Sequence, residues 1–156
     1  MPTTNKFPQG HRLRIGRFSE SNRAYLLTTV TYQRRLVFHD IYLARIVVQA
    51  MQHQHRSGQI NSMAYVVMPD HVHWLVQLMG DNNLGSIMRC FKGFTAFKIN
   101  QALGETGRFW QSGYHDHAIR EEENIRTVAR YIIANPLRAG LVEQIEDYAL
   151  WDAVWL

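Results

Sequence analysis

The order of apolar and polar positions along the chain predicts alternating strands and helices. Strands are expected where β-branched and aromatic residues dominate, and helices where apolar residues recur about every 3.6 positions. The predicted strands are residues 25–32, 59–68, 71–78 and 113–120, and the predicted helices are residues 40–56, 84–103 and 121–134. Their order, β-α-β-β-α-β-α, indicates an α+β fold: an antiparallel sheet with helices packed on one face, a ferredoxin-like or RRM-like sandwich.

The predicted helices have suitable capping residues. Asp40 is expected to cap the first helix and Asn83 the second, and the third should stop before Pro136 because a residue preceding proline avoids α geometry. Arg89 and Lys92 are expected on the solvent face of the second helix. The apolar positions expected to be buried are Ile41, Ala44, Val48 and Met51 on the first helix and Leu84, Ile87, Phe91 and Phe94 on the second.

Composition indicates one folded domain spanning residues 1–156. An apolar fraction of 46% and a charged fraction of 19% are typical of a globular protein. The single cysteine, Cys90, excludes an internal disulfide framework and a cysteine-based zinc knuckle, and it fits a reducing compartment. No apolar run suits a signal peptide or a membrane span, so we expect a cytoplasmic protein with no membrane partner.

The charge of the chain indicates an anionic partner. The net charge is +4 and the isoelectric point is about 9.5, and nucleic acid is the commonest partner of basic domains. Residues 1–20 form a basic arm that carries Arg12, Arg14 and Arg17. The alternative is a basic protein without a nucleic-acid partner.

His71-Val72-His73 is the most informative motif. In a strand, side chains alternate between faces, so the two imidazoles should point to one face and Val72 to the other, towards the core. Two imidazoles side by side make up most of a metal site, although a pair of ordinary surface histidines is the competing interpretation. Two similar triplets are present: His53 and His55 diverge on a predicted helix, whereas His115 and His117 can share a strand face.

Tyr131 and Asn135 are four residues apart near the end of the third predicted helix, and therefore on one helical face. A phenol is a usable nucleophile at phosphorus when its proton is removed and a cation neutralises the phosphate. The alternative is that Tyr131 packs in the core and Asn135 only caps the helix before Pro136.

Three ordered motifs resemble the single-tyrosine His-hydrophobic-His transposases, and most closely their REP-associated branch, the RAYT proteins. These motifs are residues 65–73 (YVVMPDHVH), 109–120 (FWQSGYHDHAIR) and 131–142 (YIIANPLRAGLV). The resemblance runs from about Gly10 to the C-terminus. It implies a divalent metal at the histidine pair and a helical tyrosine that attacks single-stranded DNA.

Carried onto this sequence, the resemblance makes His71 and His73 metal ligands, Tyr131 the nucleophile and Asn135 the third ligand, where the insertion-sequence branch usually has Gln. Tyr114 is the second choice of nucleophile. Imidazole ligands alone favour a transition metal, whereas the family implies Mg²⁺ or Mn²⁺. The implied activity is metal-dependent cleavage and rejoining beside DNA hairpins of the REP palindrome type, through a 5′-phosphotyrosine.

The resemblance also implies hairpin DNA as partner, bound by a monomer or a homodimer in a bacterial cytoplasm. Arginine suits phosphates and guanine edges, and an aromatic ring can stack on an unpaired base. Two other functions remain open: a hairpin-binding protein that has lost cleavage, and a small metal-dependent hydrolase in which Tyr131 only packs. The expected DNA contacts are Arg12, Arg14, Arg17, Arg34, Arg35, Arg89, Lys92, Arg108 and Trp110.

Overall fold

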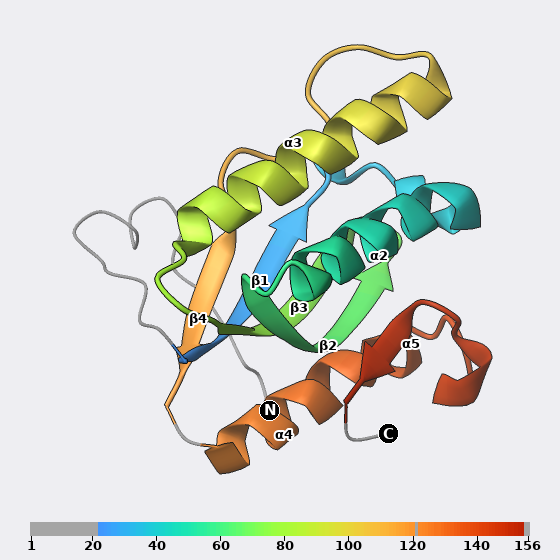
Figure 1. Ribbon diagram of the computed structural model, residues 1–156. Coiled ribbons are helices and arrows are strands. Elements are labelled where there is room, and N and C mark those ends of the chain that lie inside the picture. The colour runs from blue at the N-terminus through green and yellow to red at the C-terminus, as the bar shows by residue number, and fades with distance from the viewer. Residues whose placement is uncertain (1–21, 121, 155–156) are drawn as a thin grey trace.

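The computed structural model describes residues 22–120 and 122–154, where five strands form one antiparallel sheet (Figure 1). Their order across the sheet is β4-β1-β3-β2-β5. This is the α+β class that the sequence predicts. The strands are β1 (Ala24–Val30), β2 (Ile60–Met68), β3 (His71–Leu78), β4 (His115–Ile119) and β5 (Trp151–Ala153), and the α-helices are α2 (Ile41–Arg56), α3 (Leu84–Leu103), α4 (Glu122–Ile133) and α5 (Asn135–Arg138).

Local interactions set the element boundaries close to their predicted positions. The Asp40 carboxylate accepts a hydrogen bond from the Tyr42 amide at 2.9 Å and starts α2. The Asn83 side chain accepts one from the Ser86 amide at 3.3 Å and starts α3. Between β2 and β3 the chain reverses within Pro69-Asp70, so that Met68 pairs directly with His71. The hairpin that carries the two histidines is therefore tight and its register is defined.

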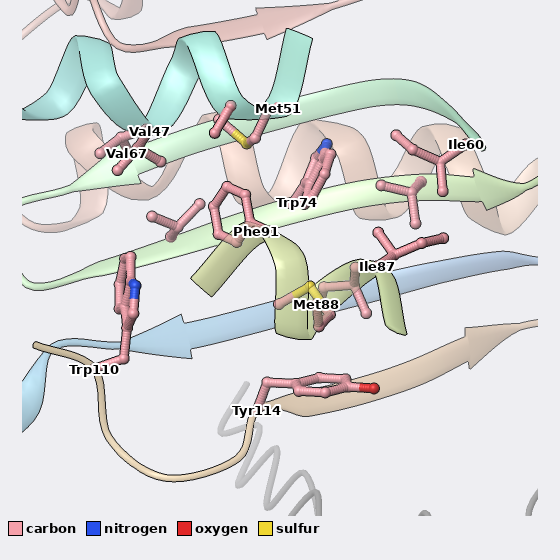
Figure 2. Close-up of a cluster of buried hydrophobic side chains, with 14 of the residues drawn as sticks. Val47, Met51, Ile60, Val67, Trp74, Ile87, Met88, Phe91, Trp110 and Tyr114 are labelled. Atoms are coloured by element: carbon pink, nitrogen blue, oxygen red, sulfur yellow. The ribbon is translucent and has the colours of Figure 1, made fainter. Parts of the chain in front are cut away.

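The main hydrophobic core lies between one face of the sheet and the pair α2 and α3. Trp74 of β3 packs on Phe91 of α3, with ring centroids 5.2 Å apart, and Val47 and Met51 of α2 complete the contact (Figure 2). Every second residue of β3 from Val72 to Leu78 faces this core. The alternation thereby sends His71 and His73 to the opposite face.

The buried stripes of the two helices differ in detail from the prediction. On α3, Phe94 is 50% exposed, and Thr95 occupies the buried position instead. The reason is that 3.6 residues per turn move the stripe from Phe91 to Thr95, whose hydroxyl accepts a hydrogen bond from Nε1 of Trp110. On α2 the buried stripe is shifted relative to the predicted one. It consists of Leu43, Ala44, Val47, Ala50, Met51 and Gln54.

Helix α4 packs on the other face of the sheet, where the sequence predicted no helix. Figure 1 shows it on the side away from α2 and α3. Ala129, Ile132 and Ile133 contact a second apolar cluster that includes Leu26 and Leu75. The expectation of helices on one face thus holds for α2 and α3 only, because alternate residues of the central strands are apolar on both sides.

The C-terminal region contains two elements that the sequence analysis missed. Strand β5 pairs with β2, and the short helix α5 starts at Asn135 directly after α4. Ala134 is the N-cap of α5, so Asn135 does not cap a helix as the alternative interpretation proposed. Pro136 is accommodated because proline is tolerated in the first turn of a helix. Within the described ranges, no helix is both long and apolar enough to cross a membrane.

Candidate active site

His71 and His73 lie at the start of β3, half-buried on the face that α4 covers. Their ring centroids are 4.9 Å apart and their planes make an angle of 82°. The predicted common face of the two imidazoles is therefore confirmed, and Val72 packs on the opposite, larger core as expected.

Both imidazoles are held through Nδ1. Nδ1 of His71 donates to Oδ1 of Asp70 at 2.6 Å, and Nδ1 of His73 lies 2.8 Å from the hydroxyl of Thr28, its cross-strand neighbour on β1. Because a carboxylate can only accept, Nδ1 of His71 carries a proton, and in the neutral imidazole Nε2 then keeps a lone pair. Partners of this kind orient metal-ligating histidines in proteins.

The charges around the pair favour neutral imidazole at His73. Burial, followed by the positive charges of His71 and Arg138, lowers the pKa of His73 to about 3. Burial alone would raise the pKa of Asp70, but hydrogen bonds and charges from His71 and Arg34 bring that pKa below its ordinary value. Asp70 is thus an anion between His71 and Arg34, whose Nη1 lies 3.1 Å from its Oδ2.

Tyr131 lies on α4 with 47% of its surface exposed, so its hydroxyl does not belong to the packed core. The preceding and following apolar positions, Ala129 and Ile132, are buried against the histidine face of the sheet. The alternative in which Tyr131 packs in the core is wrong. A half-exposed phenol on the helix that covers the histidine face is accessible to a substrate.

Arg138 of α5 joins Tyr131 to Asn135. Its guanidinium carbon lies 3.9 Å from the centroid of the Tyr131 ring, a cation–π contact. Nη2 of Arg138 also donates to Oδ1 of Asn135 and to the main-chain carbonyl of Tyr131. Helix α4 contacts β3 and α5 contacts β2, so the α4–α5 junction lies beside the hairpin that carries the histidine pair.

The residues present fit a divalent metal in part. In the described chain, no three or more His, Cys, Asp and Glu side chains cluster as a metal site, and the third ligand that the resemblance implies, Asn135, is an amide. Asp70 orients His71 through Nδ1 and leaves its Nε2 for a metal, and His73 offers its Nε2 in the tautomer in which Nδ1 donates to Thr28. Asn135 offers an amide oxygen at the start of α5. That oxygen accepts the hydrogen bond of Arg138.

Known proteins are similar to this chain in sequence and in fold. The family model described as "Transposase IS200 like" matches residues 19–135, which include His71, His73, Tyr131 and Asn135. A REP-associated tyrosine transposase of Escherichia coli K12 is 31% identical over 129 residues, 82% of this chain and 67% of the relative. This chain belongs to the IS200-like transposase family. Its motifs place it with the REP-associated tyrosine transposases, as the sequence analysis expected.

Two more relatives agree with this assignment. A Haemophilus influenzae protein provisionally given the same name is 23% identical over 143 residues, 75% of this chain and 81% of the relative. A solved structure of a REP-associated tyrosine transposase bound to a REP hairpin superposes with a TM-score of 0.71 at 26% identity. The match covers 86% of this chain and 79% of that one.

Several side chains that were expected to contact DNA bind other groups of the transposase itself. Arg34 pairs with Asp70, and Arg35 pairs with both oxygens of Glu105 at 2.8 and 3.2 Å. Nζ of Lys92 donates to the main-chain carbonyls of Gln111, at 2.8 Å, and Gly113. These three cations stabilise the fold around β1, α3 and the following loop, and their contacts to DNA stay predictions.

The aromatic contact expected at Trp110 is wrong. Trp110 is 4% exposed and packs within the main core, where it contacts Phe91 and Phe109 (Figure 2). Arg108 next to it is exposed, with its guanidinium carbon 5.3 Å from the centroid of the Tyr32 ring. Arg89 is also exposed. Arg12, Arg14 and Arg17 lie outside the described residues.

The second-choice tyrosine and the other two histidine triplets have different surroundings, and His115 lies beside Thr28 of the site. Tyr114 is 7% exposed in the main core, on the face opposite the histidine pair, and is no candidate nucleophile. His115 and His117 share one face of β4, as the sequence allowed, and His115 and His73 flank Thr28 in the register of the sheet. His55 accepts a hydrogen bond from the Ser62 amide at the end of α2.

Three site residues were missed: Thr28, Asp70 and Arg138. Asp70 is adjacent to His71 in the sequence, and Arg138 follows Asn135 by three residues, so adjacency was a usable signal for the first and helical spacing for the second. Thr28 carries no local signal, because it lies beside His73 only through the register of β1 against β3.

Proposed function

We propose that this transposase cuts and rejoins single-stranded DNA beside a hairpin, with Tyr131 as the nucleophile. The observation that carries the proposal is that α4 lies on the histidine face of the sheet with Tyr131 half-exposed. A nucleophile and a pair of oriented imidazoles are then available to one phosphate, which is the arrangement that phosphoryl transfer requires.

The reaction exchanges one phosphodiester for another. The Tyr131 oxygen attacks the phosphorus and loses its proton to solvent, and the bond to the 3′ oxygen breaks. The products are a 5′-phosphotyrosine and a free 3′-hydroxyl. Because no bond is hydrolysed, a second 3′-hydroxyl can reverse the step without ATP.

The chain's own residues prepare the site for this step. The hydrogen bond between Nδ1 of His73 and the Thr28 hydroxyl orients that imidazole, its depressed pKa keeps it neutral, and Asp70 orients His71. We propose that His71, His73 and Asn135 hold Mg²⁺ or Mn²⁺. Such an ion, when bound, neutralises charge on the phosphate.

A DNA hairpin is the proposed partner. Support comes from the solved relative, which is bound to a REP hairpin, and from the net charge of +4. Among the expected DNA contacts, Arg89 and Arg108 are exposed in the described chain, and the basic arm adds Arg12, Arg14 and Arg17.

The test is covalent trapping on a labelled hairpin with a single-stranded 5′ extension. We expect the wild-type protein to form an adduct that survives denaturing electrophoresis, and Tyr131→Phe to form none while hairpin affinity and stability stay unchanged. Tyr42→Phe, at a 76% exposed tyrosine of α2, is the matched control and should behave as wild type. Cleavage by Tyr131→Phe at the wild-type rate would remove Tyr131 from the mechanism.

The hydrogen bond between Arg138 and the Asn135 amide favours a second function, hairpin binding without cleavage, because it engages the oxygen that a metal would use. This function predicts tight hairpin binding and no adduct at any metal concentration. Cut DNA without an adduct would instead indicate hydrolysis.

A further inference from the structure

Arg138 contacts two groups that the proposed reaction uses. Its guanidinium lies over the ring of Tyr131, the proposed nucleophile, and donates to the amide oxygen of Asn135, the proposed third ligand. Helix α5 makes this possible, since Asn135 and Arg138 lie one turn apart.

The contact at Asn135 has a consequence for metal binding. Of the two polar atoms of an Asn side chain, only Oδ1 can bind a cation, because the amide nitrogen is a donor. In this structure Oδ1 accepts from a guanidinium, which also repels any positive charge that approaches the histidine pair.

The surroundings of Arg138 allow the guanidinium to move. Arg138 is exposed, and so are its neighbours Leu137, Ala139 and Gly140. A planar guanidinium binds phosphate through two parallel hydrogen bonds, which are stronger than its bond to a neutral amide. A DNA phosphate placed near Tyr131 therefore competes with Asn135 for Arg138.

We propose that Arg138 controls the third metal ligand: without DNA it holds the Asn135 amide oxygen, and a DNA phosphate draws it away and leaves that oxygen to the metal. This inference rests on the proposed function. It makes metal and DNA binding mutually reinforcing, since a coupling between two ligands is reciprocal. Arg138 is a positioning residue in this scheme.

The experiment measures Mn²⁺ affinity by the loss of the free-ion electron paramagnetic resonance signal. Every variant carries Tyr131→Phe so that DNA is not cut, and each titration is done with and without a hairpin that has a single-stranded 5′ extension. We expect the hairpin to tighten Mn²⁺ binding about tenfold in the parent protein. Arg138→Met should bind Mn²⁺ that tightly without DNA, and the hairpin should add little.

Three further variants separate this role from a loss of charge or of structure. Arg130→Met removes one positive charge from the exposed surface of α4 and should bind Mn²⁺ as the parent does. Arg138→Lys keeps the charge but loses the fork, and should lie between the parent and Arg138→Met. Asn135→Ala should abolish the gain in the Arg138→Met background and change little in the parent without DNA, a coupling that a double-mutant cycle measures.

The outcomes distinguish this inference from the function on which it rests. Equal Mn²⁺ affinity of Arg138→Met and the parent in the absence of DNA overturns the role of Arg138 and leaves the metal site intact. Mn²⁺ binding by no variant, with or without DNA, overturns the metal site itself. If Arg130→Met also binds Mn²⁺ more tightly than the parent, the loss of any nearby positive charge explains the effect, and the proposal is overturned.

Discussion

At the scale of single residues, the site depends on hydrogen bonds that come from outside the motif. The hydroxyl of Thr28 and the carboxylate of Asp70 each meet Nδ1 of one histidine. These partners fix the rings on a strand that already orients them. The imidazoles are thus prepared before any ligand arrives, which limits the entropy lost on binding.

Thr28→Val tests this preparation, because valine keeps the shape and removes the hydroxyl. We expect Mn²⁺ affinity, measured in the presence of the hairpin, to fall about tenfold or more, as removal of such partners does at other metal sites. The free energy of unfolding should fall by only about 1 kcal/mol, the net value of one hydrogen bond. Thr28→Ser keeps the hydroxyl and should retain the affinity; an equal loss in both variants would implicate packing instead.

At the scale of elements, the packing of α4 decides on which face of the sheet Tyr131 lies. Ile132 is fully buried between α4 and the sheet, while its neighbour Tyr131 is half-exposed. Burial of the apolar stripe therefore fixes the rotation of α4 about its axis, and with it the position of the tyrosine. The geometry of the candidate site depends on this packing as much as on the motif residues.

Ile132→Ala should destabilise the protein by about 2–5 kcal/mol, since it removes a buried side chain and leaves a cavity. Chemical denaturation measures the change. The matched control is Ile41→Ala on α2, where the side chain is 42% exposed and a much smaller loss is expected. We also expect adduct formation by Ile132→Ala to fall under conditions where it is still folded, and full activity there would show that α4 need not be held so closely.

At the scale of the whole molecule, the C-terminal segment closes the sheet on the β2 side. β5 pairs with β2, and the Tyr148 hydroxyl donates to the carbonyl of Val67 at 2.6 Å, across 81 positions of sequence. Burial raises the pKa of Tyr148 to about 12. The neutral phenol is therefore the form that the folded protein stabilises.

The sign of the resulting pH dependence follows from that raised pKa. Between pH 10 and 12 the unfolded chain loses the Tyr148 proton while the folded protein keeps it. The contribution of Tyr148 to the free energy of unfolding is therefore fully present below pH 10 and is lost as pH rises through 12. Tyr148→Phe should remove this part of the alkaline loss and lower stability by about 1 kcal/mol at neutral pH. Denaturant titrations at pH 8 and pH 11 give the comparison, with the exposed Tyr42→Phe as control. If the free energy of unfolding of Tyr148→Phe falls between pH 8 and pH 11 as much as that of the wild type, groups other than Tyr148 cause the decrease.

The sequence by itself determined the features that depend on near neighbours. Caps, hydrophobic period and the turn at Pro69-Asp70 act over a few residues, so the limits of α2, α3, β2 and β3 and the common face of His71 and His73 could be predicted. The family motifs also identified Tyr131 and Asn135 as candidates.

Only the tertiary structure decided what depends on distant partners. The face that α4 covers, the pairing of β5 and the contact of Thr28 with His73 follow from packing and register between elements far apart in sequence. Trp110 is the clearest case, because an aromatic ring suits a base or a core equally well, and here it packs in the core. Arg138 is another: its spacing places it near Asn135, but the fold of α4 onto the sheet brings its charge to His73.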